Sequence, residues 1–128
     1  MNNRPLPCAV LVTLLLVTAP LSAHHGAAAY DIGHPAELAA TVTAFEWRNP
    51  HALLRFDVRE NEGAVEHWVA ETAGLVILVR AGWDRHALKP GDRVTVVGFR
   101  ATNGTNTMLL RRVVLDDGHE LTNFIPTQ

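Results

Sequence analysis

Two adjacent histidines stand directly after the apolar start of this chain, which has seven histidines in 128 residues. Residues 1–23 are typical of a signal peptide, because the basic residue Arg4 precedes an apolar stretch and small residues end the segment at Ala23. If the leader is removed after Ala23, the pair His24 and His25 begins the mature chain. The free amine and the imidazole of His24 can then bind one metal ion together.

A second imidazole would complete a T-shaped set of three nitrogen ligands, the arrangement known as a histidine brace. Nitrogen-rich, tetragonal sites favour Cu(II) over other divalent ions. His51 is the first choice, because it follows the rigid Asn49-Pro50 turn at the start of a predicted strand, and His25 is a further ligand. The α-amine, with an ordinary pKa near ~7.7, must lose a proton to bind, so affinity for Cu(II) should rise with pH. Removal after Ser22 would make Ala23-His24-His25 the start and put His25 third, where the amine, two amides and the imidazole also bind Cu(II).

Other side chains are alternatives or additions to this ligand set. His34 and His67 are alternative imidazoles, and Asp31 or Glu46 would add an oxygen ligand. Two simpler interpretations stay open. The histidine pair is also a polar start compatible with processing, and the ring of His51 can pack in a turn and hydrogen-bond a backbone carbonyl.

Aromatic and basic side chains indicate a second kind of site. Trp47 and Trp68, together with Arg55, are candidates for an open face that binds a partner protein or a small ligand. The aromatic residues are more typical of the core in a domain with few other large side chains. The formal net charge of -2 argues against nucleic acid as a partner.

The residue types give little support to catalysis. Ser22 and Cys8 are the only serine and cysteine, and both lie in the leader, so the mature chain has no serine or thiolate nucleophile and no disulfide. No phosphate-binding glycine loop and no zinc-protease motif is present. We therefore expect a non-catalytic binding module.

The elements that position these residues are mainly strands, predicted over residues 38–47, 52–58, 64–71, 93–101, 107–115 and 119–124. Strict alternation of apolar and polar residues is clearest over residues 52–58. Over residues 64–71 the buried face stays open, since Trp68 argues for one face and the valines for the other. Residues 74–81 carry apolar positions at helical spacing and end at Gly82, which predicts a short helix.

Three strands, a helix and two or three further strands predict a small, mainly β, OB-like Greek-key barrel of five to six strands. The helix would lie between the third and fourth strands and close one end of the barrel. Residues 24–35 are expected to form an extended N-terminal arm, and residues 36–128 a single domain. An open β-sandwich with the helix on one edge is the alternative architecture.

Several motifs resemble those of a family of small exported bacterial proteins known only as a domain of unknown function. They are His24-His25-Gly26, Ala29-Tyr30-Asp31, Phe45-Glu46-Trp47-Arg48-Asn49-Pro50-His51, Leu78-Val79-Arg80-Ala81-Gly82-Trp83 and Leu88-Lys89-Pro90-Gly91-Asp92. The block from Phe45 to His51 and the block that joins Arg80-Ala81-Gly82-Trp83 to Leu88-Lys89-Pro90-Gly91-Asp92 are specific in combination, although each alone is weak. The resemblance covers nearly all of the mature chain and implies an exported single domain, but no activity. Gly26 stands where that family usually has Ser, so no hydroxyl role is expected there.

The leader also predicts the location of the protein. Its apolar run is about 13 residues, short of the roughly 20 needed to span a bilayer, which favours cleavage over a retained anchor. We expect a periplasmic or secreted protein with no stable membrane span. Its partner would be copper or, in the alternative, a periplasmic protein, and the sequence leaves its oligomeric state open.

Overall fold

The computed structural model describes residues 26–61 and 63–124. The predicted leader, His24 and His25 lie outside these residues. The elements, in chain order, are the 3-10 helix η1 (Ala27–Ala29), β1 (Tyr30–Glu46), β2 (Leu53–Arg59), β3 (Val65–Glu71), α1 (Leu75–Arg80), β4 (Arg93–Ala101), β5 (Thr107–Leu115) and β6 (Glu120–Thr122). The predicted strands 93–101 and 107–115 are confirmed at both ends.

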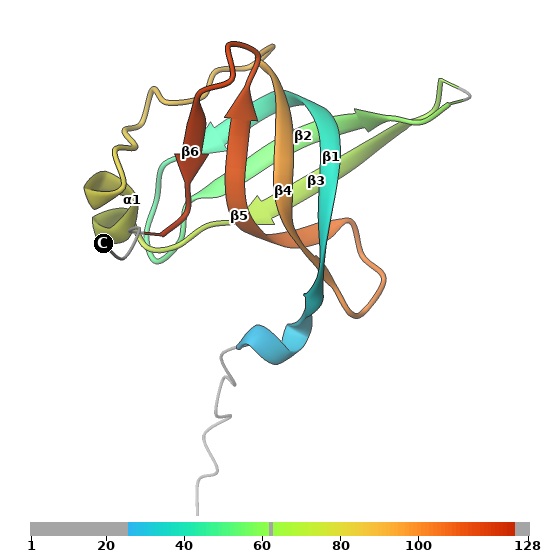
Figure 1. Ribbon diagram of the computed structural model, residues 1–128, viewed down its shortest axis with the longest axis horizontal. Helices are drawn as coiled ribbons and strands as arrows, with labels where there is room; N and C mark the ends of the chain where they lie inside the picture. The colour runs from blue at the N-terminus through green and yellow to red at the C-terminus, as the bar shows by residue number, and fades with distance from the viewer. Residues whose placement is uncertain (1–25, 62, 125–128) are drawn as a thin grey trace, which may run out of the picture.

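Five of the six strands close into a barrel, and β6 is added beside β5. Antiparallel neighbours follow the order β3-β2-β1-β4-β5-β6, and a parallel pairing of β3 with β5 closes the barrel. In Figure 1, α1 lies to the left of the barrel and the β2–β3 hairpin extends away to the right. This strand order, with a helix between β3 and β4, confirms the predicted OB-like barrel and excludes the open sandwich.

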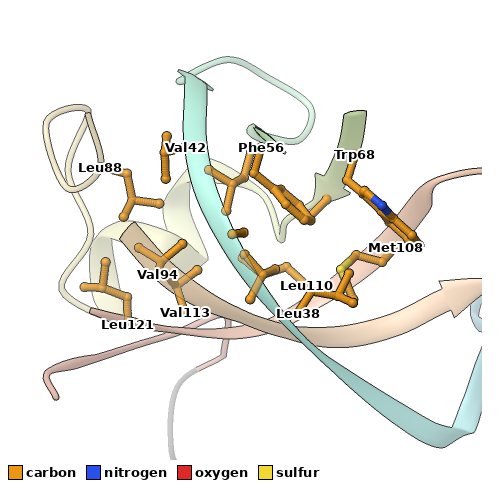
Figure 2. Packing of buried hydrophobic residues seen from close by; sticks show 14 of the residues in the cluster. Leu38, Val42, Phe56, Trp68, Leu88, Val94, Met108, Leu110, Val113 and Leu121 are labelled. Carbon is orange, nitrogen blue, oxygen red and sulfur yellow. The ribbon is translucent and has the colours of Figure 1, made fainter. Parts of the chain in front are cut away.

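The barrel interior is apolar and is filled from every strand. Ala52, Leu54 and Phe56 are buried, as the alternation over residues 52–58 predicts. On β3 the open question is decided in favour of Trp68, which points inward while Val65 is exposed. Figure 2 shows the Trp68 ring among the buried side chains of the core cluster, close to Met108. Burying each large apolar side chain contributes about 1.5–3 kcal/mol.

The predicted helix is confirmed, and its C-terminal end explains why it is so short. Gly82 has a φ of 89°, and its N–H donates to the Val79 carbonyl at 3.1 Å. The N–H of Trp83 donates to the Leu78 carbonyl at 2.9 Å, which completes a Schellman motif. Leu78 and Trp83 are both buried and anchor the helix to the end of the barrel.

The first strand begins earlier than predicted. β1 starts at Tyr30, so residues 30–35, expected in a separate arm, belong to the strand. Tyr30 pairs with Ala101 and Pro35 with Phe99, with an irregular register between the two pairs. Gly33 and Pro35 lower the local strand propensity, but β4 supplies a pairing partner, and tertiary pairing overrides local preference.

Candidate metal centre

His51 lies in the loop between β1 and β2, with its ring held in one orientation. Its Nδ1 is 2.9 Å from the carbonyl oxygen of Thr72. A carbonyl oxygen can only accept, so Nδ1 carries the proton and donates it. Nε2, on a side chain that is 45% exposed, faces the Glu71 carboxylate and can bind a metal ion when it carries no proton. The hydrogen bond to a backbone carbonyl is the one expected for a histidine packed in a turn, and it is also the contact that orients metal-binding histidines.

The carbonyl that holds His51 is itself part of a rigid segment. Thr72 is buried, and its backbone N–H and its hydroxyl both donate to the Ala52 carbonyl, at 3.1 and 3.0 Å. A Cβ added to Gly74 would lie 3.3 Å from the Pro50 carbonyl oxygen, so the loop also packs closely on the start of α1. The position of His51 is therefore set by the ends of two strands and a helix.

Glu71, the last residue of β3, joins His51 to the start of β1. Its Oε1 lies 3.6 Å from Nε2 of His51, and its Oε2 accepts a hydrogen bond from the Tyr30 hydroxyl at 3.4 Å. Burial raises the pKa of the Tyr30 phenol, and the neighbouring charge of Glu71 raises it further. The sequence did not indicate Glu71 as a neighbour of His51, because no spacing along the chain relates residues 30, 51 and 71.

The other predicted ligands are paired elsewhere. His34 contacts the Asp31 carboxylate at 3.0 Å within the exposed start of β1. His67 contacts Asp57 at 2.6 Å across β2 and β3. Within residues 26–61 and 63–124, no three His, Cys, Asp or Glu side chains are grouped so that they could hold a metal ion. A site at His51 would therefore need ligands from outside these residues.

Glu46 is also committed to other partners. A hydrogen bond from the Arg55 guanidinium lowers the pKa of the Glu46 carboxyl. Burial raises this pKa in part, and the charges of Arg55 and Arg48 lower it further. The carboxylate is thus bound by arginine side chains, and within the described residues it forms no ion pair with His51.

The predicted face of Trp47, Trp68 and Arg55 does not form a single surface. Trp68 is only 4% exposed and stacks on Phe56, with ring centroids 6.4 Å apart. Arg55 and Trp68 both line one hollow of about 380 Å³, whereas Trp47 lies beside α1. The prediction failed because the large ring of Trp68 gains more from burial in the core than from an exposed position.

Trp47 instead lines a shallow groove beside α1. The groove has a volume of about 300 Å³ and is lined by Trp47, Leu75, Val76, Val79 and Arg80. Val76 and Val79 are 66% and 58% exposed, which is unusual for two neighbouring apolar side chains on one short helix.

Fold and site together define a small OB-type β-barrel with an oriented, exposed histidine beside a carboxylate at the seam where the barrel closes. The chain belongs to the family of unknown function DUF6152, whose model matches residues 12–111. This confirms the resemblance to an uncharacterised family. Comparison with curated proteins and with solved structures found no match.

Neither the family nor the fold points to a catalytic reaction. Among the helices of residues 26–61 and 63–124, none is long and apolar enough to cross a membrane.

Proposed function

We propose that this protein is an exported, non-catalytic module that binds Cu(II) through the processed N-terminal His24, with His51 as the second imidazole ligand and His25 as a further ligand. The observation that carries the proposal is the orientation of the His51 ring by Thr72. Its Nδ1–H is used on Thr72, so Nε2 is the ring nitrogen that can bind a metal, from a partly exposed position beside Glu71.

The connection of the N-terminal segment to the barrel supports the proposal. Tyr30 contacts the same carboxylate that faces His51. His24 precedes Tyr30 by six residues, of which Ala27–Ala29 form η1. With at most about 3.3–3.6 Å per extended residue and about 2.0 Å per residue in a 3-10 helix, the reach is roughly 16 Å. That reach is sufficient for the N-terminal amine and imidazole to meet His51.

The test uses protein exported with its own leader and purified after processing. Mass spectrometry should place the mature start at His24, and isothermal titration should give a sub-micromolar Kd for Cu(II). His51→Ala should weaken binding by at least about tenfold. His67→Ala is the matched control, because that exposed histidine is paired with Asp57, and it should leave the Kd unchanged.

Absence of Cu(II) binding by correctly processed protein would overturn the proposal, as would a His51→Ala variant with the affinity of the wild type. A mature start at Ala23 would move the amine to a different ligand set without His51. Cell fractionation tests the location at the same time, and we expect the mature chain in the periplasm or the medium.

A second candidate function, binding of a partner protein, is favoured by the groove beside α1. Val76 and Val79 are apolar and exposed, while Arg80 lines the same groove and has no ion pair among the residues that the structure describes. These features fit a segment of another protein that presents an apolar side chain and a carboxylate.

Short peptides can separate the two functions. A peptide with Leu and Glu side chains should shift the NMR signal of the Trp47 indole N–H, and Val76→Asp should abolish the shift. The same variant should keep the Cu(II) affinity of the wild type. An equal shift with a Leu and Lys peptide would contradict the proposed role of Arg80.

A further inference from the structure

We infer that β1 and β2 bind an extended segment of a partner protein between them as an added strand, and that a carboxylate of this segment pairs with Arg59. The binding site is an edge cleft between residues 37–39 of β1 and residues 58–59 of β2. It contains neither the proposed copper ligands nor the groove beside α1, so it is independent of both functions proposed above.

The edge cleft exists because β1 and β2 stop pairing partway along their length. The last pair of their ladder is Thr41 with Asp57, although both strands continue beyond it. The same register would next bring Ala39 opposite Arg59, but within the described residues the ladder stops before this pair. In Figure 1 the β2–β3 hairpin extends to the right, away from β1.

The unpaired part of β1 turns backbone groups toward the edge cleft. On the other side of this strand, the N–H of Val42 donates to the Asp92 carbonyl at 2.8 Å, so the even-numbered residues before Val42 face β4. The odd-numbered residues Glu37 and Ala39 then direct their N–H and carbonyl groups to the opposite edge. A strand edge with unpaired backbone groups is a template for a further strand.

Arg59 supplies the second edge. Asp57 faces Thr41 across the ladder, and Arg59, two residues further along β2, directs its backbone groups to the same side. A volume of about 760 Å³ lies between the two edges, and Ala39 and Arg59 both line it. An extended segment in this position can form main-chain hydrogen bonds with both strands.

The inner side of the edge cleft is apolar. Leu38 belongs to the core cluster, Val58 packs against that cluster, and both line the edge cleft. Because side chains alternate along a strand, every second residue of the bound segment faces this side. These residues of the partner should therefore be apolar.

The outer side selects a negative charge. Arg59 lines an outer hollow of about 480 Å³ together with Asp57 and Asp116. Both carboxylates already have partners, since Asp57 contacts His67 at 2.6 Å. Asp116 contacts Arg93 at 3.5 Å. Arg59 is exposed and has no ion pair within residues 26–61 and 63–124. The outward residues of the partner should therefore be acidic.

The test uses a seven-residue peptide of alternating valine and glutamate, and amide hydrogen exchange followed by NMR. In the protein alone, the N–H groups of Glu37, Ala39 and Arg59 should exchange faster than those of Leu38 and Ala40, which face β4. Peptide at ten times its Kd should slow exchange at Ala39 and Arg59 by about tenfold.

Two changes to the peptide leave the protein untouched. N-methylation of its backbone nitrogens removes every main-chain donor and should abolish the protection. Replacement of its glutamates by lysines should weaken binding by about threefold or more, because Arg59 then faces a like charge. Equal protection by the methylated peptide would exclude an added strand, and equal affinity of the lysine peptide would exclude the role of Arg59.

Protein variants locate the bound peptide. Arg59→Glu should weaken the valine and glutamate peptide by about threefold or more. Arg85→Glu is the matched control, because Arg85 is also exposed, lines neither the edge cleft nor the outer hollow, and has no ion pair in the described part of the chain. It makes the same change in net charge and should leave the affinity unchanged.

Three results would overturn the proposal. One is the absence of protection at Ala39 and Arg59 with saturating valine and glutamate peptide. Another is loss of the protection in Val76→Asp, because the peptide would then bind in the groove beside α1. The third is protection that grows with protein concentration in the absence of peptide, because a second copy of the chain would then occupy the edge cleft.

Discussion

At the scale of single residues, one hydrogen bond decides how His51 can be used. The proton on Nδ1 is committed to Thr72, so the chemistry of the ring is confined to Nε2. The same reasoning separates His51 from His34 and His67, whose Nδ1 atoms face carboxylates on the outside of the barrel. Of these three histidines, His51 is therefore the one whose ring is held by a hydrogen bond to a backbone carbonyl.

The contact of Tyr30 with Glu71 can be measured directly in the metal-free protein. Tyr30 is the single tyrosine of the chain, so the ultraviolet absorbance of phenolate reports on it alone. Burial, and then the charge of Glu71, raise its pKa above 10.0. We expect Glu71→Gln to lower this pKa while leaving it above the ordinary value, because burial remains. An unchanged titration curve would contradict the contact.

The ion pair of Glu46 predicts a pH-dependent contribution to stability. Arg55 lowers the pKa of Glu46 below 4.5, so the pair stabilises the folded state above that pH and ceases to do so as the pH falls through the lowered pKa. Glu46→Gln should reduce the free energy of unfolding by about 0.2–1 kcal/mol near neutral pH. In urea titrations the difference from wild type should vanish in acid. A difference that persists there would exclude the ion pair as its cause.

At the scale of elements, close contact between strands sets the strictest requirements. β4 and β5 change register between Val97 and Gly98. A Cβ on Gly98 would lie 2.3 Å from the Leu109 carbonyl oxygen and 3.0 Å from the Met108 methyl group. The carbonyl belongs to the backbone of β5 and cannot move without disturbing the barrel.

Gly98→Ala should therefore destabilise the fold by about 1–3 kcal/mol or more. Gly33→Ala is the control, since its nearest neighbour would be an Asp31 oxygen at 3.7 Å, which is an ordinary contact. Chemical denaturation of both variants measures the difference. Equal stability of the two would show that the strands can separate at Gly98 at little cost.

The helix shows how far element prediction reaches. Apolar spacing and Gly82 were enough to predict α1, because the Schellman motif acts between residues close in the chain. The same local signals predicted that the first strand begins at residue 38, whereas β1 begins at Tyr30. The segment from Tyr30 to Pro35 becomes a strand only because β4, far away in the sequence, pairs with it.

At the scale of the whole molecule, the barrel needs its large aromatic side chains inside. Trp68 stacks on Phe56, and its exposed side is approached by Arg100, whose guanidinium carbon is 5.1 Å from the ring. The indole N–H donates to Glu66 at 2.9 Å. The ring thus fills the core, while its indole N–H has a hydrogen-bond partner, Glu66, at the rim of the barrel.

Trp68→Ala should destabilise the protein by about 3–5 kcal/mol, the range for deleting a buried aromatic side chain. Arg55→Ala, on β2 with a side chain that is 45% exposed, should cost less than about 1 kcal/mol. Thermal unfolding followed by circular dichroism compares them. Similar stabilities would mean that Trp68 is not part of the core, and would restore it as a candidate for an open binding face.

The sequence by itself determined the class of the fold, the helix and most strands, because alternation, turn residues and helix ends depend on neighbours along the chain. It also singled out His51 as a candidate. Tertiary structure alone decided that Trp68 turns inward, that β1 extends back to Tyr30 and that Glu71 faces His51. These outcomes depend on closing the barrel, which brings residues 30, 51 and 71 together through strand pairings that no local pattern encodes.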